Sequence, residues 1–241
     1  MATVEEHYRT LLGGVYSWMF GGFESGVNKF VEFFDEMSIR PKGNGIAIDL
    51  GAGCGFQAIP LARLGFTVTA IDLDATLLEE LKDNSENHPI NVVQGDIVEF
   101  DKLNIQDVEL IVCMTDTLIH LESTDMVCSL FDKAQSALQI GGKFVITFRD
   151  LTHELSNLDR FIHVKGDSER ILTCFLEYEP DSVKVHDIVY TNENGEWLLS
   201  KSYYRKLRLS EQQVIKWLKN AGFGSIISNS VNGLVTIVAT K

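Results

Sequence analysis

The sequence predicts an α/β fold with a doubly wound sheet of seven strands, most of them parallel. Three observations lead to this prediction. Short apolar runs alternate with helical patterns from residue 46 to residue 149, and such alternation favours parallel strands joined by crossing helices. The first apolar run ends in a glycine-rich turn at Gly51, Gly53 and Gly55. A β-rich stretch over 160–209 then breaks the alternation, which predicts an antiparallel insertion after the fifth strand.

The elements before the glycine turn are predicted to be helical. Residues 5–22 are expected to form a short helix that ends in a break at Gly21-Gly22. Residues 24–37 have the spacing of an amphipathic helix, with apolar side chains on one stripe. A turn over 40–45 then leads into the first strand.

The alternating part of the chain divides into strands and helices by its apolar pattern. Asp74 is the expected N-cap of the second helix, and Gly141-Gly142 is expected to end the third. Strands are predicted near 46–50, 67–72, 90–95, 108–114 and 143–149, and helices near 56–64, 75–84 and 124–139.

The insertion is predicted to contain three strands. They lie near 170–178, 183–190 and 197–209, and an Asn-Gly pair at Asn194-Gly195 predicts a hairpin between the last two. A capping box at Ser210 opens a helix that runs to about residue 220. Two closing strands near 224–229 and 234–240 complete the seven-stranded sheet.

The glycine turn and two carboxylates predict the ligand. Asp49 precedes the turn, and the second strand ends in Asp72, whose carboxylate can accept both hydroxyl protons of a ribose. A dinucleotide fingerprint would need a small residue at position 56, which is Phe56. A pyrophosphate also gains nothing from a nearby carboxylate, whereas the ammonium and sulfonium of a methionine-like group do. The pattern therefore favours S-adenosylmethionine.

These residues resemble the motifs of class I S-adenosylmethionine-dependent methyltransferases, which have a Rossmann-like fold. The resemblance runs from about residue 46 to 148, with a further match at the C-terminus. It implies one methyltransferase domain over 1–241, with a helical lid at 1–40 and the insertion at 151–209. It also implies that the following residues contact the cofactor: Tyr16, Asp49, Gly51, Ala52, Gly53, Gly55, Asp72, Leu73, Asp96, Ile97 and Met114.

The acceptor is expected at the carboxyl ends of the fourth and fifth strands, where ligands of open α/β sheets bind. The sequence there is similar in part to glycine N-methyltransferase-like enzymes, which implies that Asp116 or His120 orients the nucleophile and that Arg149 holds an acidic group. Each residue also has a structural interpretation. Asp116 could cap a short helix, His120 could be a neutral hydrogen-bonding residue, and Arg149 could pair with a local acid such as Asp150. Tyr16 could be plain core packing.

Charge and cysteine spacing narrow the function classes. Lys and Arg number 21 against 34 Asp and Glu, and a net charge of −13 disfavours nucleic acid and anionic membrane surfaces as partners. The four cysteines show no metal-binding spacing, so no metal is predicted and they are expected to be reduced thiols of a cytoplasmic protein. No apolar stretch is long enough to span a membrane. A monomer or a homodimer is expected.

The sequence thus predicts an enzyme that transfers a methyl group to a small molecule, which could bear an amine or an acidic group. Two alternatives remain open. One is a protein methyltransferase, which methyl transfer to lysate proteins would reveal. The other is a non-catalytic module that binds S-adenosylmethionine, which would hold the cofactor without turning over any acceptor.

Overall fold

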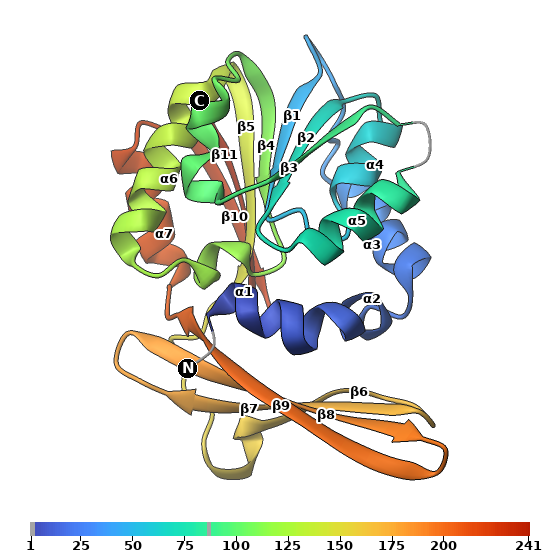
Figure 1. Cartoon of the computed structure of the whole chain (residues 1–241). Helices are drawn as coiled ribbons and strands as arrows, with labels where there is room; N and C mark the ends of the chain where they lie inside the picture. The colour runs from blue at the N-terminus through green and yellow to red at the C-terminus, as the bar shows by residue number, and fades with distance from the viewer. Residues whose placement is uncertain (1–2, 86–87) are drawn as a thin grey trace.

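A computed structural model describes residues 3–85 and 88–241 and contains two sheets (Figure 1). The first two residues of the predicted lid lie outside the described residues. The main sheet has the order β10-β11-β5-β4-β1-β2-β3. Its strands are β1 (Ile46–Leu50), β2 (Thr67–Asp72), β3 (Ile90–Gln94), β4 (Val108–Cys113), β5 (Leu138–Arg149), β10 (Ser225–Val231) and β11 (Leu234–Thr240).

The main sheet is doubly wound, as predicted. Strands β1 to β5 pair in parallel, and β11 joins β5 antiparallel, followed by β10. One face is covered by α3 (Phe23–Glu36), α4 (Ala58–Arg63) and α5 (Ala75–Asn84), the other by η3 (Ile97–Leu103), α6 (Thr124–Ala137) and α7 (Glu211–Asn220). Because both faces are covered, the central strand β4 is buried at every position, which explains its continuous apolar run.

The predicted end of the third helix is wrong. Helix α6 ends at Ala137, and Gly141-Gly142 lies within β5, which begins at Leu138 rather than near residue 143. The register between β4 and β5 shifts here, from Val108 opposite Leu138 to Leu110 opposite Lys143. The glycine pair also makes backbone hydrogen bonds with Lys241 at the end of the chain. The pair thus forms an irregular strand start instead of a helix cap.

The insertion is a separate antiparallel sheet of four strands, one more than predicted. Its order is β6 (Phe161–Gly166), β7 (Arg170–Tyr178), β8 (Ser182–Glu193) and β9 (Glu196–Leu207). The short strand β6 was missed, since it alternates weakly and is almost wholly exposed. The Asn194-Gly195 hairpin is confirmed, because both residues adopt positive φ between β8 and β9.

The N-terminal segment lies between the two sheets (Figure 1). It winds almost continuously through α1 (Val4–His7), η1 (Tyr8–Leu12), η2 (Gly13–Val15) and α2 (Tyr16–Met19), and the predicted break follows at Gly21-Gly22. His7 is fully buried against the second sheet, where its Nε2 lies 2.8 Å from the Asp187 carboxylate. At the other end, Trp18 Nε1 donates to Asp167 at 2.6 Å. Both ends of the segment are therefore fastened to the second sheet.

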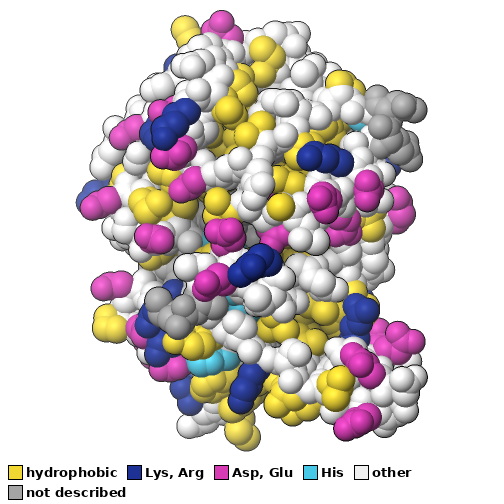
Figure 2. Space-filling view, viewed as in Figure 1, with side chains coloured by type: hydrophobic (Ala, Val, Ile, Leu, Met, Phe, Trp, Pro, Cys, Tyr) yellow, Lys and Arg dark blue, Asp and Glu magenta, His cyan; other side chains and the backbone are white. Residues whose placement is uncertain are grey.

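The second sheet leaves many apolar side chains at the surface. Figure 2 shows hydrophobic side chains gathered over this part of the molecule. They include Phe161, Tyr190, Trp197, Leu198 and Leu199. In the part of the chain that the structure describes, no helix is both long and apolar enough to cross a membrane.

Candidate cofactor and acceptor site

A cavity opens where the carboxyl ends of the parallel strands meet the N-terminal segment. Together with its open mouth it has a volume of about 730 Å³. Among the residues that line it are four carboxylates and no Lys or Arg, so it favours a cation. The lining residues are Val4, Glu5, Tyr8, Tyr16, Gly51, Gly53, Asp72, Leu73, Asp74, Leu77, Asp96, Ile97, Thr115, Thr117, His120 and Leu121.

The glycine turn forms one wall of this cavity. Gly51 has a φ of 81° and packs so closely on the loop after β4 that a Cβ would lie 2.3 Å from Thr117 Cγ2. Gly53 has a φ of 51°, and a Cβ there would project to within 3.9 Å of Tyr16, across the space that a ligand would use. The turn therefore needs glycine both for its backbone conformation and for its bare surface.

Two acidic side chains are fixed at the same wall. Asp72 Oδ2 accepts from the Gly53 amide at 2.8 Å, and its Oδ1 accepts from the Asp74 amide at 2.9 Å. Each carboxylate oxygen has a second lone pair, so Asp72 can still accept hydroxyl donors from a ribose. Asp96 caps η3 through Oδ1 at 2.9 Å from the Val98 amide, which leaves Oδ2 for an amino group.

Asp49 does not line the cavity. It is buried, and neither of its carboxylate oxygens has a hydrogen-bond partner among residues 3–85 and 88–241. Burial, with a smaller contribution from the charge of Asp72, raises the pKa of Asp49 to about 8. A direct contact between Asp49 and the ligand therefore stays a prediction, and the structure gives this carboxyl a buried place below the turn.

The end of the cavity beyond the turn is aromatic and polar. Tyr8 comes from the N-terminal segment, and its ring centre lies 6.0 Å from Tyr16 and 5.8 Å from His120. The His120 Nε2 atom is buried, and it has no hydrogen-bond partner in the described part of the chain. Burial and the positive charge of Lys206 lower the pKa of His120 to about 3, so its imidazole is neutral at physiological pH.

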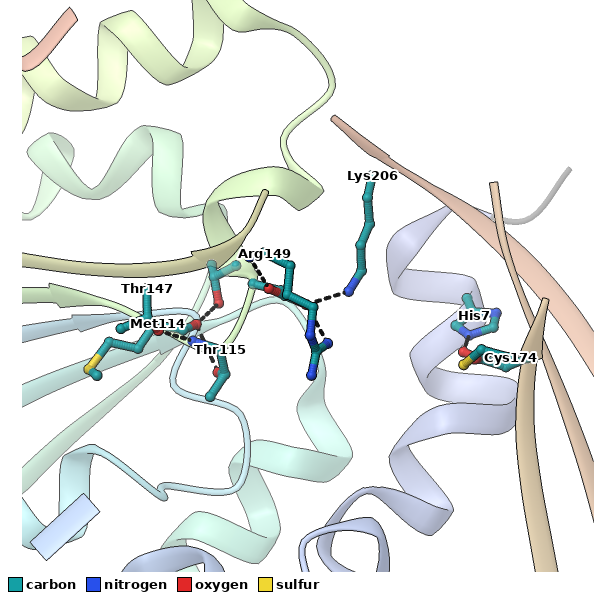
Figure 3. Close-up of polar contacts among 10 residues, drawn as sticks. His7, Met114, Thr115, Thr147, Arg149, Cys174 and Lys206 are labelled. Atoms are coloured by element: carbon teal, nitrogen blue, oxygen red, sulfur yellow. Dashed lines mark hydrogen bonds and ion pairs between the residues drawn. The ribbon is translucent and has the colours of Figure 1, made fainter. Parts of the chain in front are cut away.

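Asp116 has two cationic partners. Its Oδ2 lies 3.0 Å from Arg149 Nη1 and 2.7 Å from Lys206 Nζ, while Oδ1 accepts from the Arg149 amide at 2.9 Å (Figure 3). Burial alone would raise the pKa of Asp116, but these two cations hold it well below its usual range. Asp116 precedes η4 (Thr117–His120) without capping it through its side chain. Both oxygens of its carboxylate thus have partners within the chain.

The structure brings most of the predicted site residues together. Of the sequence-predicted set, Tyr16, Gly51, Gly53, Asp72, Leu73, Asp96, Ile97 and His120 line the cavity, whereas Asp49, Ala52, Gly55, Met114, Asp116 and Arg149 do not. Ala52 and Met114 are buried behind the wall, and Gly55 packs against Leu81. Sequence reasoning missed Tyr8, Thr115 and Lys206. Lys206 lies far from any motif, so no local signal marked it.

Known proteins share this fold and these motifs. A family model described as "Methyltransferase domain" matches residues 47–142. Two bacterial proteins that carry the name "Putative methyltransferase" match most of the chain. One, from Geobacillus sp. strain WCH70, is 25% identical over 183 residues, 73% of this chain and 72% of its own. The other, YqeM from Bacillus subtilis strain 168, is 28% identical over 205 residues, 78% of this chain and 76% of its own.

A solved structure extends the likeness to almost the whole fold. S-adenosylmethionine-bound CalS10, an amino pentose methyltransferase from Micromonospora echinaspora, aligns with a TM-score of 0.72 and 13% identity, over 95% of this chain and 96% of that one. The glycine turn, the two fixed acids and the doubly wound sheet give the protein the motifs and the fold seen in class I methyltransferases, which it resembles. It is an S-adenosylmethionine-dependent enzyme, as the sequence predicted.

The cavity fits this cofactor by two observations. A Cβ at Gly53 would project into the ligand space, so the turn keeps a bare backbone where a ligand lies against it. The carboxylates of Glu5, Asp72, Asp74 and Asp96 around it suit a cationic sulfonium and the hydroxyl and amino donors of an adenosine.

Gly51→Ala should disrupt the wall of the cavity. The new methyl group would meet Thr117 at 2.3 Å, and alanine at a φ of 81° is strained. We expect a loss of about 1–3 kcal/mol in the free energy of unfolding, measured by urea titration, together with weaker binding of S-adenosylhomocysteine. Gly195→Ala is the matched control, because it has a similar φ of 92° but open space around it. Equal affinity in both variants would contradict the steric role of Gly51.

Proposed function

We propose that the enzyme methylates a small-molecule acceptor with an amine nucleophile, bound at the aromatic end of the cavity. The observation that carries this proposal is the enclosure of that end by Tyr8, Tyr16 and His120, under an N-terminal segment fastened to the second sheet at both ends. Such a covered site admits a small molecule more readily than a folded protein. CalS10, named as an amino pentose methyltransferase, has the same fold, and amino sugars are therefore the first acceptors to test.

The cofactor would be held along the glycine turn. Asp72 would accept the ribose hydroxyls, and Asp96 with Ile97 and Leu73 would contact the adenine. Gly51, Gly53 and Tyr16 would lie along the methionine part, with Asp49 below. When bound, S-adenosylmethionine supplies an electrophilic methyl group on a good leaving group. The protein's main contribution is then alignment of the acceptor, an effect that can contribute about 7–11 kcal/mol.

His120 is the better candidate for contact with the nucleophile. Both oxygens of Asp116 are paired with Arg149 or Lys206, and these cations lower its pKa, so it would be a poor acceptor for a proton. His120 is neutral and has an unpartnered nitrogen, so it could accept a hydrogen bond from the amine. The low pKa makes it a weak base. The positive charges of Lys206 and Arg149 nearby would instead favour the neutral form of the amine, which is the nucleophilic one.

Arg149 would hold an acidic group of the acceptor. Its side chain is 66% exposed, and among the described residues the guanidinium forms a hydrogen bond only through Nη1. The outer side of the guanidinium can therefore form a bidentate contact. Arg149→Met should raise KM about tenfold or more for acidic amine acceptors, since a charged hydrogen bond contributes about 1.5–3 kcal/mol. Steady-state kinetics on matched amines with and without an acidic group tests this. An equal change for both groups would favour a purely structural role.

The function itself is tested in two steps. Calorimetry with S-adenosylhomocysteine should show binding to the wild-type protein, and Asp72→Asn serves as the matched control for the site. The enzyme is then incubated with cofactor that carries a labelled methyl group and with a panel of amines, amino sugars and amino acids, and we expect the label on one of these small molecules. If the label appears instead on proteins of a cell lysate, the result would favour a protein methyltransferase. Cofactor binding without transfer to any acceptor would favour a non-catalytic module.

A further inference from the structure

One side chain of the second sheet, that of Lys206, contacts the end of β4 beside the cavity. Lys206 lies on β9, in the row that faces the main domain, and its ammonium is 2.7 Å from Asp116 Oδ2 (Figure 3). The Lys206 and Asp116 side chains are only 10% and 8% exposed. A buried lysine needs an anionic partner, and a buried carboxylate that loses one of its cations is left partly uncompensated. The pair therefore ties the insertion to the end of β4.

The turn that contains Asp116, the partner of Lys206, is conformationally strained. Thr115 and Asp116 have φ values of 53° and 71°, in the left-handed region. Each such residue costs about 1–3 kcal/mol unless its surroundings hold it. Here Asp116 is held on three sides, by the amide and guanidinium of Arg149 and by Lys206. The turn is held by these contacts of the carboxylate and by Thr147, whose Oγ1 accepts from the Thr115 amide at 2.9 Å and whose carbonyl accepts from the Asp116 amide at 3.3 Å.

The same turn is part of the cofactor cavity. Thr115 and Thr117, on either side of Asp116, both line it. Thr117 packs directly on Gly51 of the glycine turn, with no room even for a methyl group between them. A continuous series of contacts thus runs from Lys206 through Asp116 and Thr117 to Gly51. A change at the second sheet would reach the wall against which the cofactor lies.

We propose that Lys206 is a positioning residue, which completes the ion pair of Asp116 and so holds the Thr115–Thr117 turn in the form that cofactor binding needs. The antiparallel sheet then contributes to the affinity for the cofactor, in addition to covering the acceptor end of the cavity. The proposal concerns the cofactor site and is independent of which acceptor is methylated. It also explains why Asp116, which is paired with two cations, stands at the end of a core strand.

The test compares three variants on one strand. Lys206→Met removes the charge and keeps most of the volume, Lys206→Arg keeps the charge, and Lys201→Met makes the same change at an exposed position of β9. Calorimetry with S-adenosylhomocysteine, below the melting temperature of each variant, gives the dissociation constants. We expect at least a tenfold loss of affinity in Lys206→Met, a change within about threefold in Lys206→Arg, and none in Lys201→Met.

Several outcomes would overturn the proposal. Wild-type affinity in a folded Lys206→Met variant, with or without a lower melting temperature, assigns Lys206 a structural role only. Equal losses in the arginine and methionine variants would trace the effect to packing and not to charge. If Lys206→Met does not fold, Asp116→Asn/Lys206→Met removes the uncompensated charge, and wild-type affinity there overturns the proposal equally. A wild-type protein that fails to bind would instead contradict the cofactor site itself.

Discussion

Asp72→Asn should weaken binding of S-adenosylhomocysteine by about 100-fold or more. The carboxylate would lose its charge-assisted hydrogen bonds to the ribose hydroxyls, each of which contributes about 1.5–3 kcal/mol, and tenfold in affinity corresponds to about 1.4 kcal/mol. Both Asp72 oxygens also accept backbone amides, from Gly53 and Asp74. The carbonyl oxygen of asparagine can still accept one backbone amide, but its NH2 group cannot accept a hydrogen bond. One of these two contacts is therefore lost as well, and the glycine turn loosens. Isothermal calorimetry measures the change.

Asp74→Asn is the matched control for this prediction. Asp74 lines the same cavity, but its Oδ1 caps α5 by accepting from the Leu77 amide at 2.9 Å, and asparagine caps helices equally well. We expect a change in affinity within about threefold. Circular dichroism should show both variants folded. Similar losses at the two positions would mean that negative charge in the cavity matters, and not the contact of Asp72 with a ribose.

The sequence could predict which residues of the glycine turn and of the strand ends line the cavity, because these features are local. The glycine turn, Asp72 and Asp96 each stand at the end of a parallel strand, and the carboxyl ends of such strands meet at one edge of the sheet. The positions of β1, β2 and α5 were likewise predictable to the residue, since each combines a clear apolar pattern with a turn or a cap. For these residues, the position in the sequence motif is enough to predict the position in the fold.

The acceptor half depended on contacts that no local pattern encodes. Lys206 meets Asp116 across 90 residues of chain, and Tyr8 meets His120 only because His7 fixes the N-terminal segment on the second sheet. Asp49 was predicted to contact the ligand from its place in the motif, yet its side chain is buried and is not among those that line the cavity. Burial and long-range pairing decide these features, and a motif fixes only the position of a residue along its strand.

The stability of the ligand-free protein should fall as the pH rises from about 6.5 to 8, because of Asp49. Its pKa in the folded protein is about 8, whereas in the unfolded chain a carboxyl of this type ionises near 3.9. In this window the folded state therefore binds more protons than the unfolded state, and the free energy of unfolding decreases with rising pH. His120, with its lowered pKa of about 3, has the opposite effect, but that effect fades as the unfolded imidazole, with a pKa of about 6.5, loses its proton, and this loss is nearly complete by about pH 7.5.

Asp49→Asn isolates this contribution, since asparagine has the same shape and no charge to bury. Urea midpoints at half-unit steps should decrease with pH in the wild type and decrease less in the variant, which should be the more stable of the two at pH 8. Asp72, whose pKa burial also raises, acts in the same direction and remains in the variant, so some slope persists. Asp132→Asn, at an exposed position on α6, should leave the wild-type slope unchanged. Identical slopes in wild type and Asp49→Asn would mean that the Asp49 carboxylate is ionised throughout, and that the glycine turn tolerates a buried charge without any ligand.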